Sequence, residues 1–136
     1  MSQLAFFFDR CFPRPIAYMI AQYESRYHVR FLDDDSRFRT DSPDTEIIQT
    51  LGDDSNYRWV LLSADARITR RPAERAALSG AGIKFFYCGR AWFKMDMHEQ
   101  AWKFVRSWPS IVEIAEHHKQ KIFEIEGTNL KITPSG

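Results

Sequence analysis

The sequence lacks the features that would staple a small secreted domain or anchor a protein in a membrane. It contains only 2 cysteines in 136 residues, and Cys11 and Cys88 form neither a disulfide framework nor a CxxC metal site. No apolar stretch approaches the roughly 20 residues of a membrane span. No basic region or small-residue cleavage site marks a signal peptide. We therefore expect a cytoplasmic location, no membrane association and two buried thiols.

A strong net charge is also missing. The formal charge is +1, which excludes an overall basic field for nucleic acid and leaves only local patches. Apolar residues, by contrast, are plentiful: the chain is 44% hydrophobic and 15% aromatic, enough for a packed core at this length. We expect one domain over residues 1–136.

Short apolar runs alternate with amphipathic segments along the chain. The runs predict strands over residues 4–8, 29–32, 59–62 and 83–88, and helical spacing predicts helices over 13–23, 42–52, 71–80 and 97–118. Residues 121–132 alternate around a turn and predict a hairpin. Strands alternating with helices favour an α/β fold, with a mainly parallel sheet covered by helices on both faces.

Acidic residues follow two of the predicted strands. Asp9 ends the first apolar run and Asp65 follows the run at 59–62. Parallel strands end at the same edge of a sheet, so the two carboxylates would share an ion if the strands are neighbours. By contrast, we expect Asp33 to Asp35, Asp53 and Asp54 to lie in solvated loops and turns.

A third acid comes from the helix predicted to begin with Ser42 as its N-cap and Pro43 at its first position. Asp44 shares a helical face with Ile47, Ile48 and Leu51, so it should point toward the sheet. Glu46 should face solvent, although the two acids are easily confused in a first turn. Glu74 lies similarly in the first turn of the next helix.

Three or more converging carboxylates repel one another unless a cation neutralises them. Mg²⁺ and Mn²⁺ prefer such oxygen ligands, and they activate water for attack on phosphate esters. Ser63 is placed to orient a carboxylate or a water molecule. The spacing thus predicts a metal site made by Asp9, Asp44 and Asp65, against the plainer alternative that each acid caps a helix or faces solvent.

Arginines gather in the sequence around these acids, and guanidinium groups bind phosphate in a bidentate way. The candidates for RNA contact are Arg10, Arg67, Arg70 and Arg71, with ordinary surface charge as the alternative. Arg90, Trp92 and Lys94 would add stacking and phosphate contact after the fourth strand, unless Trp92 is packed.

Several segments resemble the PIN-like domains, and in particular the compact group close to VapC-type toxins. Residues 7–13, FFDRCFP, are similar to the FxDxxLP opening of that family. Residues 44–48, DTEII, resemble its D-x-E-I helix start, and residues 62–65, LSAD, its [TS]-x-D strand end. Residues 71–75, RPAER, are similar to the xxAExxAL helix of longer members. Together the motifs span most of the chain, roughly residues 5–125.

The resemblance implies a three-layer α/β/α fold and an endoribonuclease dependent on Mg²⁺ or Mn²⁺, often the toxin of a toxin–antitoxin pair neutralised by a cognate antitoxin. It implies Asp9, Asp44 and Asp65 as metal ligands. Many relatives carry a further acid just after the [TS]-x-D motif; here Arg67 stands two residues beyond Asp65, and Glu74 is the nearest substitute. Homodimers are common in the family, and the Trp-rich segment 97–118 would provide a surface.

Two other functions compete with cleavage. A PIN-like domain that binds protein or RNA without cutting would explain the missing fourth acid and the aromatic surplus. A phospho-accepting receiver domain also carries acids at parallel strand ends, but it expects a lysine where the fourth strand ends, and Tyr87 to Arg90 do not supply one.

Overall fold

Six strands form a single sheet in the computed structural model, which describes residues 3–127 and 131–135. Their spatial order is β2-β1-β3-β4-β5-β6. The first five are parallel to their neighbours, and the last is antiparallel to the fifth. Their bounds are β1 (Gln3–Phe8), β2 (His28–Phe31), β3 (Tyr57–Ser63), β4 (Lys84–Cys88), β5 (Ile122–Ile125) and β6 (Ile132–Pro134).

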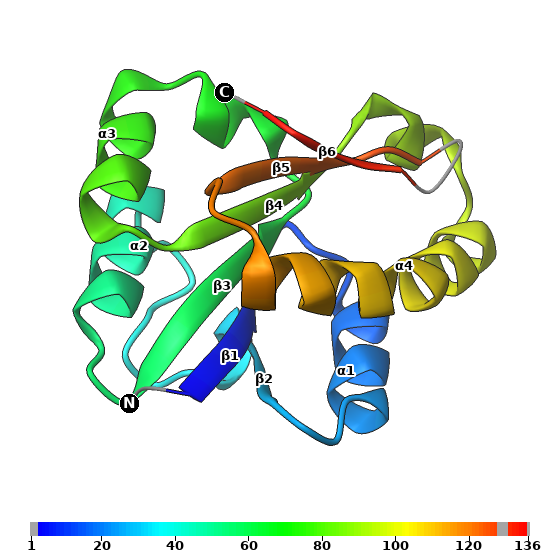
Figure 1. Cartoon of the computed structure of the whole chain (residues 1–136), viewed down its shortest axis with the longest axis horizontal. Helices are drawn as coiled ribbons and strands as arrows, with labels where there is room; N and C mark the ends of the chain where they lie inside the picture. Colours follow the sequence, from blue (N-terminus) through cyan, green and yellow to red (C-terminus); the bar gives the residue numbers. More distant parts are fainter. Residues whose placement is uncertain (1–2, 128–130, 136) are drawn as a thin grey trace.

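Four α-helices in the described part of the chain cover the two faces of this sheet (Figure 1). They are α1 (Arg14–Tyr23), α2 (Asp44–Asp53), α3 (Pro72–Ala81) and α4 (Met97–His117). One face carries α1 and α4, and the other carries α2 and α3. Short 3-10 turns η1 (Leu32–Asp34), η2 (Ala66–Thr69) and η3 (Arg90–Lys94) follow β2, β3 and β4. The predicted three-layer α/β fold is confirmed.

The β1 strand is central to both halves of the core. Phe6 and Phe8 pack among side chains of α1 and α4, whereas Phe7 packs among those of α2 and α3, and all three are fully buried. Because both faces of the strand are covered, its sequence is continuously apolar instead of alternating.

The sheet places the end of β1 where the direction of winding reverses. After β1 the chain adds β2 on one side, then crosses back to add β3 on the other, with Phe8 in register with Leu62. The Asp9 amide continues this pairing by donating to the Leu62 carbonyl at 3.1 Å. Open α/β sheets bind ligands at such a switch point, outside the carboxyl ends of the strands.

The C-terminal hairpin is confirmed as the antiparallel pair β5–β6, in which Ile125 faces Ile132. Part of the turn predicted at 127–129 lies outside the described residues. None of the helices in the described ranges combines the length and the apolar character that a bilayer span requires.

The predicted start of α2 is wrong by one or two residues. The helix begins at Asp44, and Pro43 occupies the N-cap position without a side-chain cap. Ser42 is buried, and its hydroxyl accepts a hydrogen bond from the Arg39 amide at 2.8 Å instead of capping the helix. Its hydroxyl therefore stabilises the preceding loop.

Two other environments differ from the sequence-based expectations. Cys11 is exposed because the turn after β1 brings it to the surface, whereas Cys88 is buried as expected. Asp35 is buried, because Arg30 and Arg37 hold its carboxylate at 3.1 and 2.7 Å.

The acid pair at the end of α2 also departs from a plain solvated turn. Asp53 is the last residue of the helix and is exposed. The Asp54 carboxylate accepts a hydrogen bond from Trp59 Nε1 at 2.8 Å and pairs with Arg37 at 3.2 Å. These contacts fix the entry into β3.

Candidate functional site

Asp9 is the most deeply placed acid of the site, only 4% exposed. Its Oδ1 accepts the Cys11 amide at 3.0 Å. Burial raises the pKa of Asp9 to about 7, the Ser63 and Cys11 hydrogen bonds oppose this, and the charges of Asp44 and Asp65 add to it. No cation is among these dominant influences, so the buried carboxylate is under-neutralised.

Ser63 links the two strand-end acids. It is fully buried at the last position of β3. Its Oγ accepts the Asp65 amide at 2.9 Å, and its hydroxyl hydrogen-bonds the Asp9 side chain. Since a hydroxyl has a single hydrogen, that hydrogen points to Asp9 and lowers its pKa. The serine thus holds Asp9 beside the turn that carries Asp65.

Asp44 approaches the same edge from the first turn of α2. It is half-buried and Glu46 is exposed, in agreement with the predicted helical faces. Burial and the charge of Asp65 raise the pKa of Asp44. The three acids are therefore close enough to influence one another's protonation, although α2 and the two strands are far apart in sequence.

Two arginines pair with these acids. Arg67 Nε donates to Asp65 Oδ1 at 2.9 Å. Arg71 lies among three carboxylates, 3.5 Å from Asp44, 3.6 Å from Asp65 and 3.4 Å from Glu74. Burial alone would raise the pKa of Asp65, but its bonds with Arg67 outweigh burial and lower it. Glu74 is therefore at the site, linked to Asp44 through Arg71.

The other predicted arginines, Arg10 and Arg70, are exposed in the neighbourhood of the acids. Arg10 is exposed, and its charge lowers the pKa of Asp44. Arg70 is exposed and borders a hollow together with Asp65, Arg67 and Arg90. Of the four predicted arginines, Arg67 and Arg71 contact the acids directly, and a role in RNA binding stays a prediction.

The acids have the ligand chemistry that a divalent cation requires, but their side chains are not oriented as a ready metal site. Carboxylate oxygens are ligands that Mg²⁺ and Mn²⁺ prefer, and Asp9 is a buried carboxylate with acidic neighbours. Within residues 3–127 and 131–135, however, no three His, Cys, Asp or Glu side chains are arranged as a ready metal cage. Asp44 and Asp65 are instead oriented toward Arg71 and Arg67. A cation would have to compete with these arginines.

Sequence reasoning missed one aromatic residue at the site. Trp92 is buried, with its Nε1 donating to the Ile125 carbonyl at 2.7 Å, so the packed alternative is correct. Phe93, the next residue, is 64% exposed and borders two hollows, one of which is also bordered by Asp65. No local sequence pattern marks Phe93, because its exposure follows from Trp92 taking the buried position in η3.

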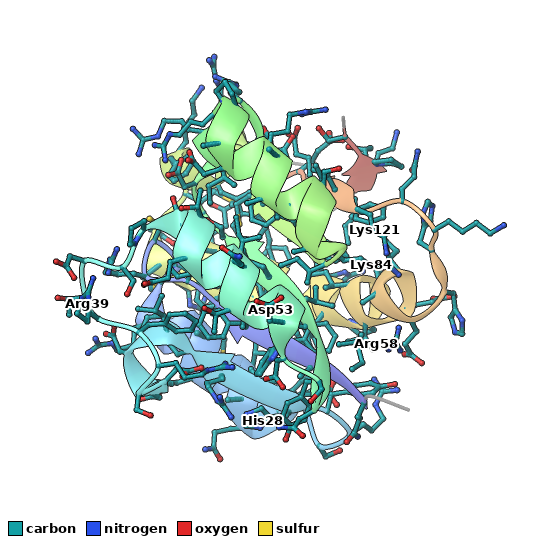
Figure 2. All side chains as sticks on the ribbon, turned by 90° about the vertical axis from the view of Figure 1, so that its left-hand side faces the viewer. His28, Arg39, Asp53, Arg58, Lys84 and Lys121 are labelled. Atoms are coloured by element: carbon teal, nitrogen blue, oxygen red, sulfur yellow. The ribbon has the colours of Figure 1, made fainter. Side chains whose placement is uncertain are left out.

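A second basic cluster lies at the opposite edge of the sheet. Arg58, Lys84 and Lys121 border one hollow together with Asp54, the residue that follows α2 (Figure 2). Lys84 Nζ donates to the Ala115 carbonyl at 2.7 Å and to the Ile114 carbonyl at 3.3 Å. A lysine at a helix C-terminus offsets its unpaired carbonyls and its dipole, so Lys84 has a structural role at the end of α4.

Comparison with known proteins identifies the family of this fold. The family model described as a PIN-like domain matches residues 4–90, which make up more than half of the chain and include Asp9, Asp44 and Asp65. No curated protein and no solved structure matches the chain significantly. The family match excludes the receiver-type alternative. The chain belongs to the PIN-like domain family, a superfamily associated with nucleases.

Proposed function

We propose that this chain is an endoribonuclease dependent on Mg²⁺ or Mn²⁺. The observation that carries the proposal is the under-neutralised Asp9 carboxylate, buried at the switch point of the sheet with Asp44 and Asp65 beside it. A buried carboxylate surrounded by like charges favours a bound cation. The family association with nucleases supports the same class of reaction.

Asp9, Asp44 and Asp65 would hold the cation, with Glu74 as the nearest further acid. When bound, the cation would activate water and offset charge on the phosphodiester. Ser63 holds Asp9 in place through its hydroxyl. Arg67 and Arg71 pair with carboxylates in the structure, and RNA phosphates would compete for them as bidentate partners. Arg10 and Arg70 would contact phosphates at the rim.

Cleavage of single-stranded RNA, measured with Mg²⁺, with Mn²⁺ and with EDTA, tests this proposal. Asp9→Asn, Asp44→Asn and Asp65→Asn should abolish the metal-dependent cleavage. Asp53→Asn is the matched control, because Asp53 is an exposed acid at the other end of α2 (Figure 2). Equal cleavage by the wild type and by Asp9→Asn would exclude the proposal.

We further propose that the enzyme is the toxin of a toxin–antitoxin pair and acts in the cytoplasm. This role rests on the resemblance of residues 7–13 and 62–65 to VapC-type toxins. Its induction in a bacterial host should arrest growth, and Asp9→Asn should not. Normal growth with active wild-type enzyme would contradict the role as a toxin while leaving the nuclease activity intact.

A PIN-like module that binds without cutting is the second candidate. It is favoured by the ion pairs of Arg67 and Arg71, which neutralise Asp65 and Asp44 without a metal. Calorimetric titration with Mn²⁺ separates the two candidates. Tight binding that is lost in Asp9→Asn supports the nuclease, and absence of binding together with absence of cleavage supports the module.

A further inference from the structure

Two hollows open beside the acid site and share a rim. The first, of about 180 Å³, is lined mainly by apolar side chains, among them Phe12, Ile16 and Trp92. The second, of about 390 Å³, is bordered by Asp65 and three arginines. Cys11, Ala64 and Phe93 border both hollows. An apolar recess therefore continues into a charged one that reaches a predicted metal ligand.

Phe93 stands on this shared rim with most of its ring exposed. Among the described residues, none of the aromatic ring pairs involves Phe93, although most other phenylalanines of the chain are paired. Its backbone is nevertheless well held. The buried Trp92 anchors η3, and Gln100 Nε2 donates to the carbonyls of Trp92 at 2.8 Å and Met95 at 3.1 Å. An exposed ring on an anchored turn is a preorganised surface for a flat ligand.

The charges around the second hollow select the class of ligand. Arg70 and Arg90 are exposed and border it, and neither takes part in an ion pair within the described ranges. Two uncommitted guanidinium groups beside an exposed ring suit a ligand that carries both phosphates and planar bases. An apolar peptide would cover Phe93 but would leave both arginines without a partner.

We propose that the two hollows form a base-binding subsite for single-stranded RNA. One unpaired base stacks on Phe93 at the apolar recess, and Arg70 and Arg90 hold the adjoining phosphates beside Asp65. The inference rests on the proposed RNA substrate and defines it further. An unpaired base can enter such a recess without the cost of breaking a base pair, so the site favours single strands over duplexes.

The test is a binding measurement in EDTA, which separates recognition from cleavage. Fluorescence anisotropy with a labelled single-stranded RNA decamer of mixed sequence should show about tenfold weaker binding for Phe93→Ala. Phe93→Trp should restore the affinity. Tyr23→Ala is the matched control, because Tyr23 is also an exposed aromatic residue but ends α1 at the opposite edge. Circular dichroism confirms that each variant is folded.

Two further binding measurements identify what Phe93 recognises. With an oligomer of base-free sugar phosphates, Phe93→Ala should bind as well as the wild type. With the same RNA as a duplex, both proteins should bind weakly and equally. Arg70→Ala and Arg90→Ala should each reduce the salt dependence of single-strand binding by about one counterion. Lys121→Ala, in the basic cluster of the opposite edge, should leave it unchanged (Figure 2).

Cys11 supplies a readout independent of affinity. It borders both hollows and is exposed, whereas the other thiol, Cys88, is buried. Alkylation of Cys11 by iodoacetamide should therefore slow when single-stranded RNA is bound. The same protection by base-free oligomers would overturn the inference, as would unchanged RNA affinity of Phe93→Ala.

Failure of the base-binding subsite and failure of the proposed nuclease function would give different experimental results. Metal-dependent cleavage combined with unchanged binding by Phe93→Ala would overturn the subsite and leave the nuclease intact. Weakened binding by Phe93→Ala without cleavage in any metal would support the subsite and contradict the nuclease. Absence of binding to any single-stranded RNA would overturn the subsite.

Discussion

Arg67 donates its Nε to Asp65 Oδ1 at 2.9 Å, across only two positions of the chain. The same oxygen accepts the Arg67 amide at 3.0 Å and so caps η2. Because both contacts are local, they need no other part of the fold. The pair turns a predicted metal ligand toward a guanidinium group.

Removing this guanidinium should strengthen metal binding. Arg67→Ala removes the nearer of the two guanidinium groups that pair with Asp65, so the affinity for Mn²⁺ should rise about two- to fivefold, a modest gain because exposed pairs are weak. Calorimetric titration measures it. Arg39→Ala is the matched control, since Arg39 Nε also pairs two residues along the chain, with Asp41 at 3.0 Å. Weaker Mn²⁺ binding by Arg67→Ala would show that Arg67 positions Asp65 instead of competing for it.

The protonation of Asp9 should make the metal-free protein less stable at higher pH. Its pKa is about 7 when folded and about 3.8 when unfolded. Between these values the folded state binds more protons, so stability falls as pH rises through this window. Asp9→Asn has no carboxyl group to deprotonate, so it does not lose stability in this window. Asn Oδ1 can still accept the Cys11 amide. Its stability relative to the wild type should increase by about 2–3 kcal/mol from pH 5 to pH 8.

Urea denaturation in EDTA measures this difference. Asp53→Asn, at an exposed position, should show no comparable change between the two pH values. Adding Mg²⁺ should stabilise the wild type at pH 8 and leave Asp9→Asn unaffected, because ligand binding to the folded state raises stability. A wild-type protein that is insensitive to Mg²⁺ would argue against the metal site.

The buried pair of Trp108 and Glu24 should be important for stability. Trp108 Nε1 donates to Glu24 Oε1 at 2.9 Å across 84 positions of the chain, and both residues are buried. Trp108→Phe removes this donor from a buried carboxylate, so the free energy of unfolding should fall by about 1–3 kcal/mol. Trp102→Phe, on the exposed side of α4, should change it by less than about 0.5 kcal/mol. Equal effects of the two substitutions would contradict the assigned role.

Two glycines of the α2–α3 layer should respond in opposite directions. A Cβ added to Gly52 would lie 2.6 Å from the Ala81 Cβ, so Gly52→Ala should overpack this contact and cost about 1–3 kcal/mol. A Cβ added to Gly80 meets nothing within 4 Å. Gly80→Ala should therefore stabilise α3 by roughly 0.5–1 kcal/mol, through reduced backbone freedom. Thermal denaturation distinguishes the two, and a stabilising Gly52→Ala would show that α3 moves aside.

Much of the candidate site could be predicted because its signals are local. Asp9 ends a buried apolar run and Asp65 closely follows another. Because the strands are expected to be parallel, both acids are expected at the same edge of the sheet. The distinction between Asp44 and Glu46 follows from helical periodicity, which the exposure of Glu46 supports. Ser63 was placed by its position two residues before Asp65.

Other environments depend on residues that are remote in sequence. Asp35 is buried because Arg30 and Arg37 surround it from β2 and the following loop, and no local pattern marks an acid as paired. Arg71 contacts Asp44 across 27 positions, from the start of α3 to the start of α2. Such pairings arise only when the layers pack against one another.

The sequence by itself determined the strands, the helices, the parallel arrangement of the strands and the acids at the strand ends. These features follow from hydrophobic periodicity and from the alternation of strands with helices, which are both local properties of the sequence. Tertiary structure alone decided which charges neutralise those acids and which aromatic ring stays uncovered. Arg71 meets three carboxylates from separate elements, and Phe93 is exposed because Trp92 takes the buried position against β5. Both outcomes depend on distances between elements, which no local pattern specifies.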